Sequence, residues 1–268
     1  MKKPKACILR TAGTNCDRET AFAFHKAGAA IELLHINSLI RLRKRLRDYQ
    51  ILAIPGGFTY GDDIAAGKIL ANELRHKLTG DIKKFIQEGK IIIGICNGFQ
   101  VLVKSGLLPG NNELTQEASL VINDSGKFED RWVYLKKSQI PNPKSQNKCI
   151  WTKNLPEIIY LPVAHGEGKF ITKDKAVLQR IRDNNQIVFQ YCDEQGRSTG
   201  YPYNPNGSQD NIAGIIDDSG RILGLMPHPE RHIEAFQHPR KWQTAKKKSE
   251  GDGLQIFRNG VEYIRKNF

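Results

Sequence analysis

The fold of this chain is decided by residues 91–100, which read IIIGICNGFQ in one-letter code. The apolar run at 91–95 predicts a buried strand, and the residues after it predict a helix. Cys96 stands at the turn between them, where the backbone is crowded, and Gly94 and Gly98 flank it two residues away on either side. A helix N-terminus stabilises a thiolate, which is the reactive form of cysteine. The segment therefore predicts the cysteine nucleophile of an acyl-transfer enzyme.

The length and composition predict a single globular domain over residues 1–268. Hydrophobic residues make up 39% of the 268 residues, which is enough to bury a large core. No run of about 18 apolar residues is present, so we expect no membrane span and no membrane partner. Arg10 interrupts the first apolar run too early for a signal peptide.

The cysteines also limit the class of protein. There are five of them, scattered along the chain, and no two have the C-x-x-C spacing. This distribution argues against a disulfide framework and against a zinc site, so no metal is expected. It fits a reducing compartment, and we expect the protein to be cytoplasmic.

The chain is basic, with a formal net charge of +13, and positive residues concentrate in two runs at 41–47 and 240–248. In the first run Leu42 and Leu46 have the four-residue spacing of a helix with one buried stripe, which leaves a solvated basic face. Aromatic residues that stack on bases do not interleave with these charges, so no nucleic acid is expected as a partner. An acidic protein partner stays open.

Strands and helices alternate through the first hundred residues. The predicted strands are 6–9, 31–36, 51–54 and 91–95, and the predicted helices are 17–27, 38–47 with Ser38 as its cap, and 68–87. This alternation predicts an α/β fold, with a doubly wound, mostly parallel sheet flanked by helices. In such sheets, sites form beyond the carboxyl ends of the strands.

The second half predicts short strands and a terminal helix that Asp252 caps. The strands are expected at 120–122, 131–135, 158–163, 187–191, 212–216 and 222–226. The turn DDSG at 217–220 joins the last two as a hairpin. We therefore expect antiparallel strands to be added to the sheet in the C-terminal half.

A base for the thiol is predicted at His228, in the sequence MPHPE at 226–230. Prolines on both sides of the histidine favour an extended backbone. On an extended chain His228 and Glu230 leave the same face, so the carboxylate can hold one ring nitrogen while the other faces the sulfur. A histidine between two prolines is by itself usually a loop residue; its place directly after a strand makes it the leading candidate.

The turn PGG at 55–57, followed by Phe58, supplies a third candidate element. Such a turn is often only a tight loop. In a functional role, the backbone N–H of Gly57 is an oxyanion-hole donor, and a second donor comes from Asn97, the residue after the nucleophile.

Taken together, these motifs resemble the class I (triad) glutamine amidotransferases. Further strings narrow the resemblance: GTNCD at 13–17, PGGFTYGD at 55–62, ICNGFQ at 95–100, AHGEG at 164–168, NPNGS at 204–208, NIAGI at 211–215 and LMPHPER at 225–231. Over nearly the whole chain, this combination is similar to the family of glutaminase subunits of phosphoribosylformylglycinamidine synthase.

The resemblance implies an enzyme that hydrolyses glutamine through a thioester on Cys96. It implies that His228 relays protons, that Glu230 orients the imidazole, and that Gly57 and Asn97 donate to the oxyanion. Substrate contacts are implied at four further residues, namely Phe58, Gln100, His165 and Gly166.

The resemblance also implies partners. The ammonia passes to a separate, large synthetase subunit, which converts formylglycinamide ribonucleotide to formylglycinamidine ribonucleotide in de novo purine biosynthesis. That subunit uses ATP and Mg, so no cofactor is expected in this chain. A small bridging subunit is expected to complete the complex.

Three features depart from the family pattern or stay undecided. Ala12 stands where the family often has proline, a harmless change. The extra residues at 111–150 and 237–251 are predicted either to dock a partner or to elaborate the surface. Cys16 follows a predicted strand and begins a predicted helix, so it could be a reactive thiol. Cysteines are usually buried, however, which favours a small core residue.

Two other functions compete with this interpretation. One is a different thiol hydrolase on a similar sheet, such as a dienelactone-hydrolase-like enzyme or a peptidase; an α/β-hydrolase, however, places its acid between nucleophile and histidine, whereas here Glu230 follows His228. The other is a non-catalytic interaction module whose basic surface binds RNA. That role predicts a damaged triad, and all three residues are present.

Overall fold

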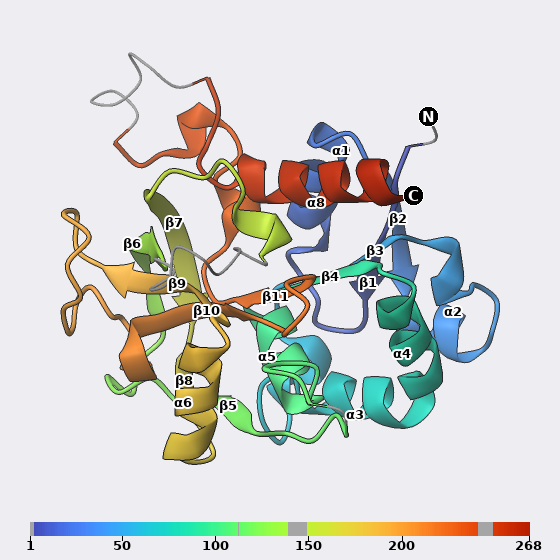
Figure 1. Cartoon of the computed structure of the whole chain (residues 1–268), viewed down its shortest axis with the longest axis horizontal. Coiled ribbons are helices and arrows are strands. Elements are labelled where there is room, and N and C mark those ends of the chain that lie inside the picture. The colour runs from blue at the N-terminus through green and yellow to red at the C-terminus, as the bar shows by residue number, and fades with distance from the viewer. Residues whose placement is uncertain (1–2, 112, 139–148, 241–248) are drawn as a thin grey trace.

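A nine-stranded sheet forms the centre of the computed structural model, which describes residues 3–111, 113–138, 149–240 and 249–268 (Figure 1). The strands follow the order β2-β1-β3-β4-β11-β10-β9-β6-β7. They are β1 (Lys5–Arg10), β2 (Ala30–His35), β3 (Ile51–Ile54), β4 (Ile91–Ile95), β6 (Glu129–Lys137), β7 (Ile158–His165), β9 (Ile187–Cys192), β10 (Ile212–Ile216) and β11 (Ile222–Leu225). Two further strands, β5 (Ala118–Val121) and β8 (Lys169–Thr172), form a separate antiparallel pair.

The sheet has a parallel half and an antiparallel half. From β2 to β11 all neighbours run parallel, and from β11 to β7 all neighbours run antiparallel. The hairpin predicted at 217–220 joins β10 to β11. The predicted fold class, a mostly parallel sheet with antiparallel strands added in the C-terminal half, is confirmed.

Helices cover both faces of the parallel half. In Figure 1, α1 (Asp17–Lys26) and α8 (Leu254–Asn267) lie on one side of the sheet, where Phe24 and Phe257 meet edge to face with ring centroids 5.0 Å apart. The opposite side carries α3 (Lys68–Lys77), α4 (Thr79–Gln87) and α5 (Asn97–Lys104). A short helix, α2 (Ile36–Ile40), follows β2, and α6 (Lys175–Asp183) precedes β9.

The register of β4 and β11 positions the chemistry-bearing segments. β4 is buried along its whole length, as a strand covered on both faces must be. It pairs in parallel with β11, where Leu225 lies opposite Ile95. Cys96 directly follows one strand and the segment leading to His228 follows the other, so both leave the sheet at the same edge.

The predicted helix at 38–47 is wrong. The helix ends at Ile40, Leu42 takes a left-handed φ of 54° and is 71% exposed, and Leu46 is buried in a separate single turn, η1 (Leu46–Asp48). The four-residue spacing of the leucines was therefore not a buried stripe. The cap is also different, because the side chain of His35, not that of Ser38, accepts a hydrogen bond at the start of α2.

Other boundaries differ in smaller ways. The predicted helix at 68–87 divides at Leu78 into α3 and α4. Asp252 does not cap α8, which begins after Gly253; its carboxylate accepts a hydrogen bond from the Tyr160 N–H at 3.0 Å. The strand β8 and the helix α6 were not predicted. Of the extra segments at 111–150 and 237–251, residues 112, 139–148 and 241–248 lie outside the described residues.

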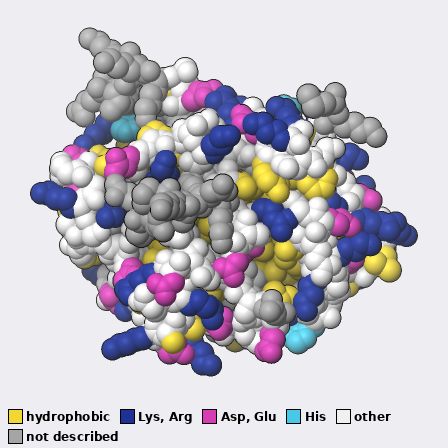
Figure 2. Space-filling model, viewed as in Figure 1, with side chains coloured by type: hydrophobic (Ala, Val, Ile, Leu, Met, Phe, Trp, Pro, Cys, Tyr) yellow, Lys and Arg dark blue, Asp and Glu magenta, His cyan; other side chains and the backbone are white. Residues whose placement is uncertain are grey.

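The surface is mixed in charge. Figure 2 shows Lys and Arg side chains spread over one face with acidic side chains among them. No helix in the described ranges is both long and apolar enough to cross a membrane.

Candidate active site

The predicted nucleophile lies on a strained turn. Cys96 joins β4 to α5 with φ 51° and ψ −107°, a conformation that non-glycine residues rarely adopt. Gly94 makes this turn possible, because a Cβ there would lie 2.5 Å from the carbonyl oxygen of Gly98. The Cys96 sulfur lies 3.6 Å from the Ala164 carbonyl oxygen. The geometry is that of a nucleophile elbow.

His228 and Glu230 meet as the sequence predicts. His228 Nδ1 and Glu230 Oε1 are 2.6 Å apart, and both side chains are almost completely buried. The short turn η5 (Pro229–Arg231) begins after His228 and brings the carboxylate back beneath the ring. Within the part of the chain that the structure describes, His228 Nε2 is buried and has no hydrogen-bond partner. One ring nitrogen is thus held and the other remains available.

Gly56 leaves the space in which the cysteine and the histidine meet. A Cβ at this position would lie 2.8 Å from His228 Cε1 and 3.4 Å from Cys96 Cβ. The two side chains therefore border the same point, and any residue larger than glycine would push between them. The reason for the first glycine of the 55–57 turn is room beside the site, since its φ is not in the left-handed region.

The electrostatics favour a charged imidazole. Burial alone lowers the pKa of His228, but the negative charges of Glu230 and of the Cys96 thiolate outweigh it and raise the pKa well above its usual range. A buried imidazolium beside a carboxylate and a thiolate is the arrangement that activates a cysteine nucleophile.

Cys16 is a second thiol at this site, as the N-cap residue of α1. Its sulfur lies 3.9 Å from His228 Nδ1, and Arg231 Nη2 donates to it at 3.1 Å. Burial raises the pKa of Cys16, although His228 opposes this. Cys16 is buried, as a small core residue is expected to be, but it also borders the site.

Ligand atoms of Cys16, His228 and Glu230 all lie within 4.8 Å of one another, a set that could hold a metal ion. The arrangement suits a proton relay better than a metal. The guanidinium of Arg231 already occupies one side of the sulfur, and His228 and Glu230 are at hydrogen-bond distance from each other.

The predicted oxyanion donors, Gly57 and Asn97, directly follow two residues that border the site, Gly56 and Cys96. Gly57 has φ 142°, a conformation that favours glycine, and a Cβ there would lie 2.7 Å from the Gly13 carbonyl oxygen. The neighbouring Phe58 N–H donates to that same oxygen at 2.9 Å and fixes the loop. Asn97 is the first residue of α5, so its backbone N–H has no acceptor in a preceding helical turn.

Gln100 is buried, and its amide is already engaged. Its Nε2 donates to the Glu167 carbonyl oxygen at 2.6 Å, and its Oε1 accepts from Asn97 Nδ2 at 2.9 Å. Gln100 thus joins α5 to the 165–168 loop. A direct contact of its side chain with a substrate stays a prediction.

His165 is buried at the end of β7. Burial, with a smaller contribution from the charge of His228, lowers its pKa to about 4, so the ring is neutral at pH 7. Its Nε2 lies 3.5 Å from Asn206 Nδ2, and Gly168 packs against the ring face. The His165 side chain is therefore packed within the protein, and the backbone at His165 and Gly166 remains the predicted substrate contact.

Phe58 and Gly166 lie together near the surface. Phe58 is 45% exposed and stacks on Phe128, with ring centroids 6.4 Å apart. A Cβ on Gly166 would lie 3.9 Å from the same Phe128 ring. Phe128 thus connects two predicted substrate residues, and the sequence analysis did not single it out.

Other neighbours of the site also went unpredicted. The Tyr191 hydroxyl accepts from Asn206 Nδ2 at 3.2 Å, and the charge of Cys96 contributes to a raised pKa of this tyrosine, after the larger effect of burial. Asn206 belongs to the string NPNGS that was noted in the sequence, so a signal existed there. Tyr191 occupies an ordinary strand position, and only the fold brings it close to Cys96.

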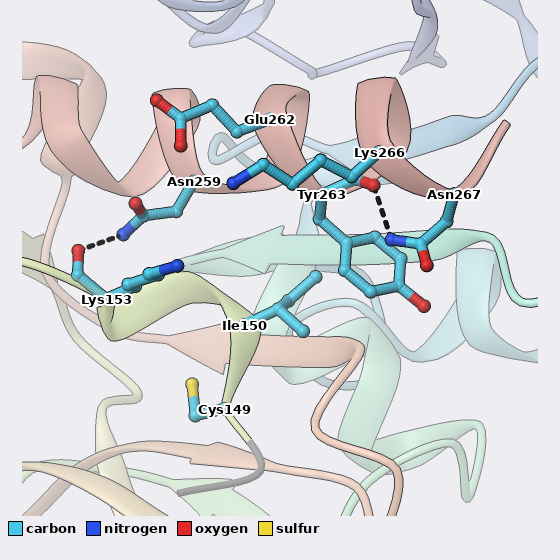
Figure 3. Close-up of a pocket in the computed structure, with 8 residues that line it drawn as sticks. All are labelled: Cys149, Ile150, Lys153, Asn259, Glu262, Tyr263, Lys266 and Asn267. Carbon is cyan, nitrogen blue, oxygen red and sulfur yellow. Dashed lines mark hydrogen bonds between the residues drawn. The ribbon is translucent and has the colours of Figure 1, made fainter.

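A cleft of about 420 Å³ lies elsewhere, between α8 and the turn η3 (Ile150–Thr152). Figure 3 shows Glu262 and Lys266 projecting from α8, with Lys153 and Ile150 on the opposite wall. Ile150 donates to the Gly220 carbonyl oxygen, which precedes β11, so this cleft lies at the amino ends of the strands. None of the predicted site residues lines it.

Comparison with known proteins gives close relatives over the full length. The sequence matches the family described as the CobB/CobQ-like glutamine amidotransferase domain over residues 3–264. It is 50% identical over 266 residues to phosphoribosylformylglycinamidine synthase subunit PurQ of Dehalococcoides mccartyi, with 99% of each chain covered. It is 43% identical over 276 residues to the protein of the same name from Methanococcus maripaludis, with 98% of each covered.

Solved structures agree with these relatives. A chain in the structure of PurLQS from Thermotoga maritima is 31% identical, has a TM-score of 0.72, and is matched over 98% of this chain and 100% of that one. A glutamine amidotransferase from Thermotoga maritima, 16% identical with a TM-score of 0.56 over 98% of this chain and 99% of that one, shares the fold.

Proposed function

Since this chain belongs to the CobB/CobQ-like glutamine amidotransferase family and, within it, to the PurQ subunits of phosphoribosylformylglycinamidine synthase, we propose that it releases ammonia from glutamine with Cys96, His228 and Glu230 as its catalytic triad. The observation that carries this assignment is that the two nitrogens of the His228 ring have different surroundings. Nδ1 is held by Glu230 at 2.6 Å, while Nε2 is buried, unpartnered among the described residues, and belongs to a ring that borders Cys96 across Gly56.

The reaction proceeds in two stages. The Cys96 thiolate attacks the side-chain amide carbon of glutamine, and His228 gives its proton to the leaving nitrogen, so that ammonia and a γ-glutamyl thioester form. Water then attacks the thioester, His228 accepts its proton, and glutamate leaves with Cys96 restored. Glu230 holds the ring in one orientation and stabilises its positive charge whenever the ring is protonated.

The negative oxygen of each tetrahedral intermediate accepts hydrogen bonds from the backbone N–H groups of Gly57 and Asn97. One group belongs to a loop that the Gly13 carbonyl oxygen contacts through the Phe58 N–H, and the other belongs to the first turn of α5. The substrate-binding part of this proposal comprises Phe58, Gln100, His165 and Gly166. The positions of Phe58 and Gly166, both next to Phe128, support a shared binding surface.

The proposal extends to the partners that the family implies. Ammonia passes to a large synthetase subunit that uses ATP and Mg to convert formylglycinamide ribonucleotide, and a small bridging subunit completes the assembly. We further propose that residues 1–268 act as one domain, which the continuous nine-stranded sheet supports. A cytoplasmic location stays part of the proposal; the described cysteines are all free, as a reducing compartment favours.

The test is glutamate release from glutamine, with and without the synthetase subunit and its nucleotide ligands. We expect release by the wild-type protein, an increase with the partner, and loss in Cys96→Ala. Cys149→Ala is the matched control, because Cys149 is equally buried but lies in the cleft at the amino ends of the strands. A folded protein that releases no glutamate under any of these conditions would overturn the assignment in favour of another thiol hydrolase or a binding module.

A further inference from the structure

The helix that follows the nucleophile carries a buried polar stripe. All residues of α5 are buried, and Asn97, Gln100 and Lys104 lie on one side at helical spacing. Lysine is seldom buried without a specific partner, because removing an ammonium group from water is costly. The triad chemistry proposed above makes no use of Lys104.

Lys104 joins two loops that approach α5 from different parts of the chain. Its Nζ donates to the Ala66 carbonyl oxygen at 2.6 Å and pairs with Glu167 Oε2 at 3.6 Å. The same Glu167 oxygen accepts from the Ala66 N–H at 3.3 Å. The ammonium group, the carboxylate and the backbone N–H and C=O of Ala66 therefore form a closed ring of contacts between the 57–67 loop and the 165–168 loop.

A second carboxylate lies near this ring. Asp62 accepts from Asn97 Nδ2 at 2.9 Å and from the Gly67 N–H at 3.3 Å. Burial raises the pKa of Asp62, and the charge of Glu167 raises it further, so the two carboxylates repel each other. The positive charge of Lys104 attracts both of them, although burial lowers its own pKa. Its ammonium group offsets the repulsion that would drive the two loops apart.

The 57–67 loop needs such a restraint because its backbone is strained. Tyr60, Asp62 and Ile64 all have φ between 55° and 71°, which is unusual for non-glycine residues and most costly for a β-branched one. Ile64 is 87% exposed, so packing of its side chain does not hold this conformation.

We propose that Lys104 is a positioning residue that locks the loop carrying the oxyanion donor Gly57 to the loop carrying His165 and Gly166. The inference rests on the proposed function, because it takes Gly57 as a transition-state donor. Gly57 precedes the strained segment, and its N–H must point at the developing oxyanion to within a few tenths of an ångström to be effective. Gln100 holds the Glu167 backbone independently, so loss of the ammonium group releases chiefly the strained segment that follows Gly57.

The first test compares Lys104→Met with Lys90→Met. Lys90 is a matched control, because it is equally buried, donates to the Arg47 carbonyl oxygen at 2.7 Å and pairs with Glu88 at 2.8 Å. It lies immediately before β4, at the opposite end of the strand from Cys96. In an assay where the wild type turns over glutamine, we expect kcat to fall about 10- to 100-fold in Lys104→Met, with KM changed less than threefold. In Lys90→Met we expect kcat to stay within twofold of the wild type.

A double variant tests the charge argument. Removing the Glu167 charge as well, in Lys104→Met/Glu167→Gln, abolishes the repulsion with Asp62 and should restore kcat at least threefold relative to Lys104→Met alone. A purely structural role predicts the reverse, since loss of a second partner in the same ring of contacts would lower activity further.

A third measurement does not depend on turnover. Amide hydrogen exchange at 58–67 should become faster in Lys104→Met and stay unchanged there in Lys90→Met. Equal kcat in the two single variants, or unchanged exchange in the loop, overturns the role of Lys104. Absence of turnover in the wild type, or full turnover in Cys96→Ala, overturns the proposed function instead, and the exchange measurement still decides whether Lys104 holds the loop.

Discussion

Gly98 packs directly against the backbone of Ile54, so that a Cβ on Gly98 would lie 1.8 Å from the Ile54 carbonyl oxygen. This contact joins the first turn of α5 to β3 and sets how deeply the nucleophile helix sits on the sheet. The flanking glycine of the elbow is thus required by helix–strand packing as well as by the turn itself.

Substitution of this glycine should therefore be severe. We expect Gly98→Ala to lower the free energy of unfolding by about 3 kcal/mol, since α5 must move away from the sheet, and to reduce glutamine turnover because Asn97 moves with it. Gly80→Ala is the control: it lies in α4, a Cβ there meets nothing within 4 Å, and alanine favours helix by up to about 1 kcal/mol. Urea unfolding of both variants measures the difference. Equal stabilities would show that α5 can shift without cost.

Glu230 should control the charge of His228. In Glu230→Gln we expect the pKa of His228 to fall and kcat to drop by about 10²-fold or more, because the imidazolium loses its carboxylate. A proton-sensitive NMR titration of the histidine ring measures the first effect. A His228 pKa that is unchanged in the variant would contradict the electrostatic assignment.

The same pair has a pH-dependent effect on stability. The folded-state pKa of His228 is raised, so its contribution is fully present below the unfolded-state pKa of about 6.5 and is lost as pH rises through the folded-state pKa. The wild type should thus exceed Glu230→Gln in stability most strongly at low pH. Urea unfolding across pH 5 to 9 tests the sign; a gap that widens as pH rises would be inconsistent with it.

His165 should have the opposite effect on the pH dependence of stability. Its folded-state pKa is lowered to about 4 from an ordinary value of 6.5. Between pH 4 and pH 6.5 the unfolded chain therefore binds a proton at this residue that the folded protein does not bind. Stability is therefore lost as pH falls from 6.5 to 4, by up to about 3 kcal/mol from this residue. His165→Gln should lose correspondingly less over that range. An acid sensitivity equal to that of the wild type would mean that the ring is not held neutral.

The five thiols should differ in reactivity. Burial raises the pKa of Cys16, and that of Cys149 and Cys192 to about 11; burial together with Glu32 raises the pKa of Cys7 to about 12. We expect iodoacetamide at pH 8 to alkylate Cys96 first, as measured by peptide mass spectrometry of the native protein. Labelling of Cys16 at a comparable rate would instead make it a second reactive thiol beside His228.

Much of the fold could be predicted from short-range patterns. The run before Cys96 and the turn at 217–220 are local signals, and the structure has the strands and the hairpin they indicate. The prediction of a helix at 38–47 was wrong because the spacing of Leu42 and Leu46 indicates a shared buried face only if the chain stays helical between them. In fact Leu42 leaves the helical conformation and points into solvent.

In the candidate site too, some residues could be predicted from local motifs and others could not. Cys96, His228 and Glu230 were predicted from their own motifs, and the structure brings them together, while their catalytic roles remain to be tested. Tyr191 and Lys104 could not be predicted, because their neighbours are distant in the sequence and their own segments look like ordinary core elements. The one local sign of Lys104 is that it directly follows the apolar run at 101–103, and this sign does not identify its partners.

The position of β11 between β4 and β10 has a consequence for how the protein is made. During synthesis the thiol leaves the ribosome long before its imidazole, and the edge of β4 stays open until the last strand of the sheet is inserted. A nascent or truncated chain that ends before β11 therefore carries a sulfur with no proton acceptor and an unpaired strand that invites association with other chains. With the triad proposed above, hydrolysis of glutamine is withheld until the C-terminal part of the chain has folded into place.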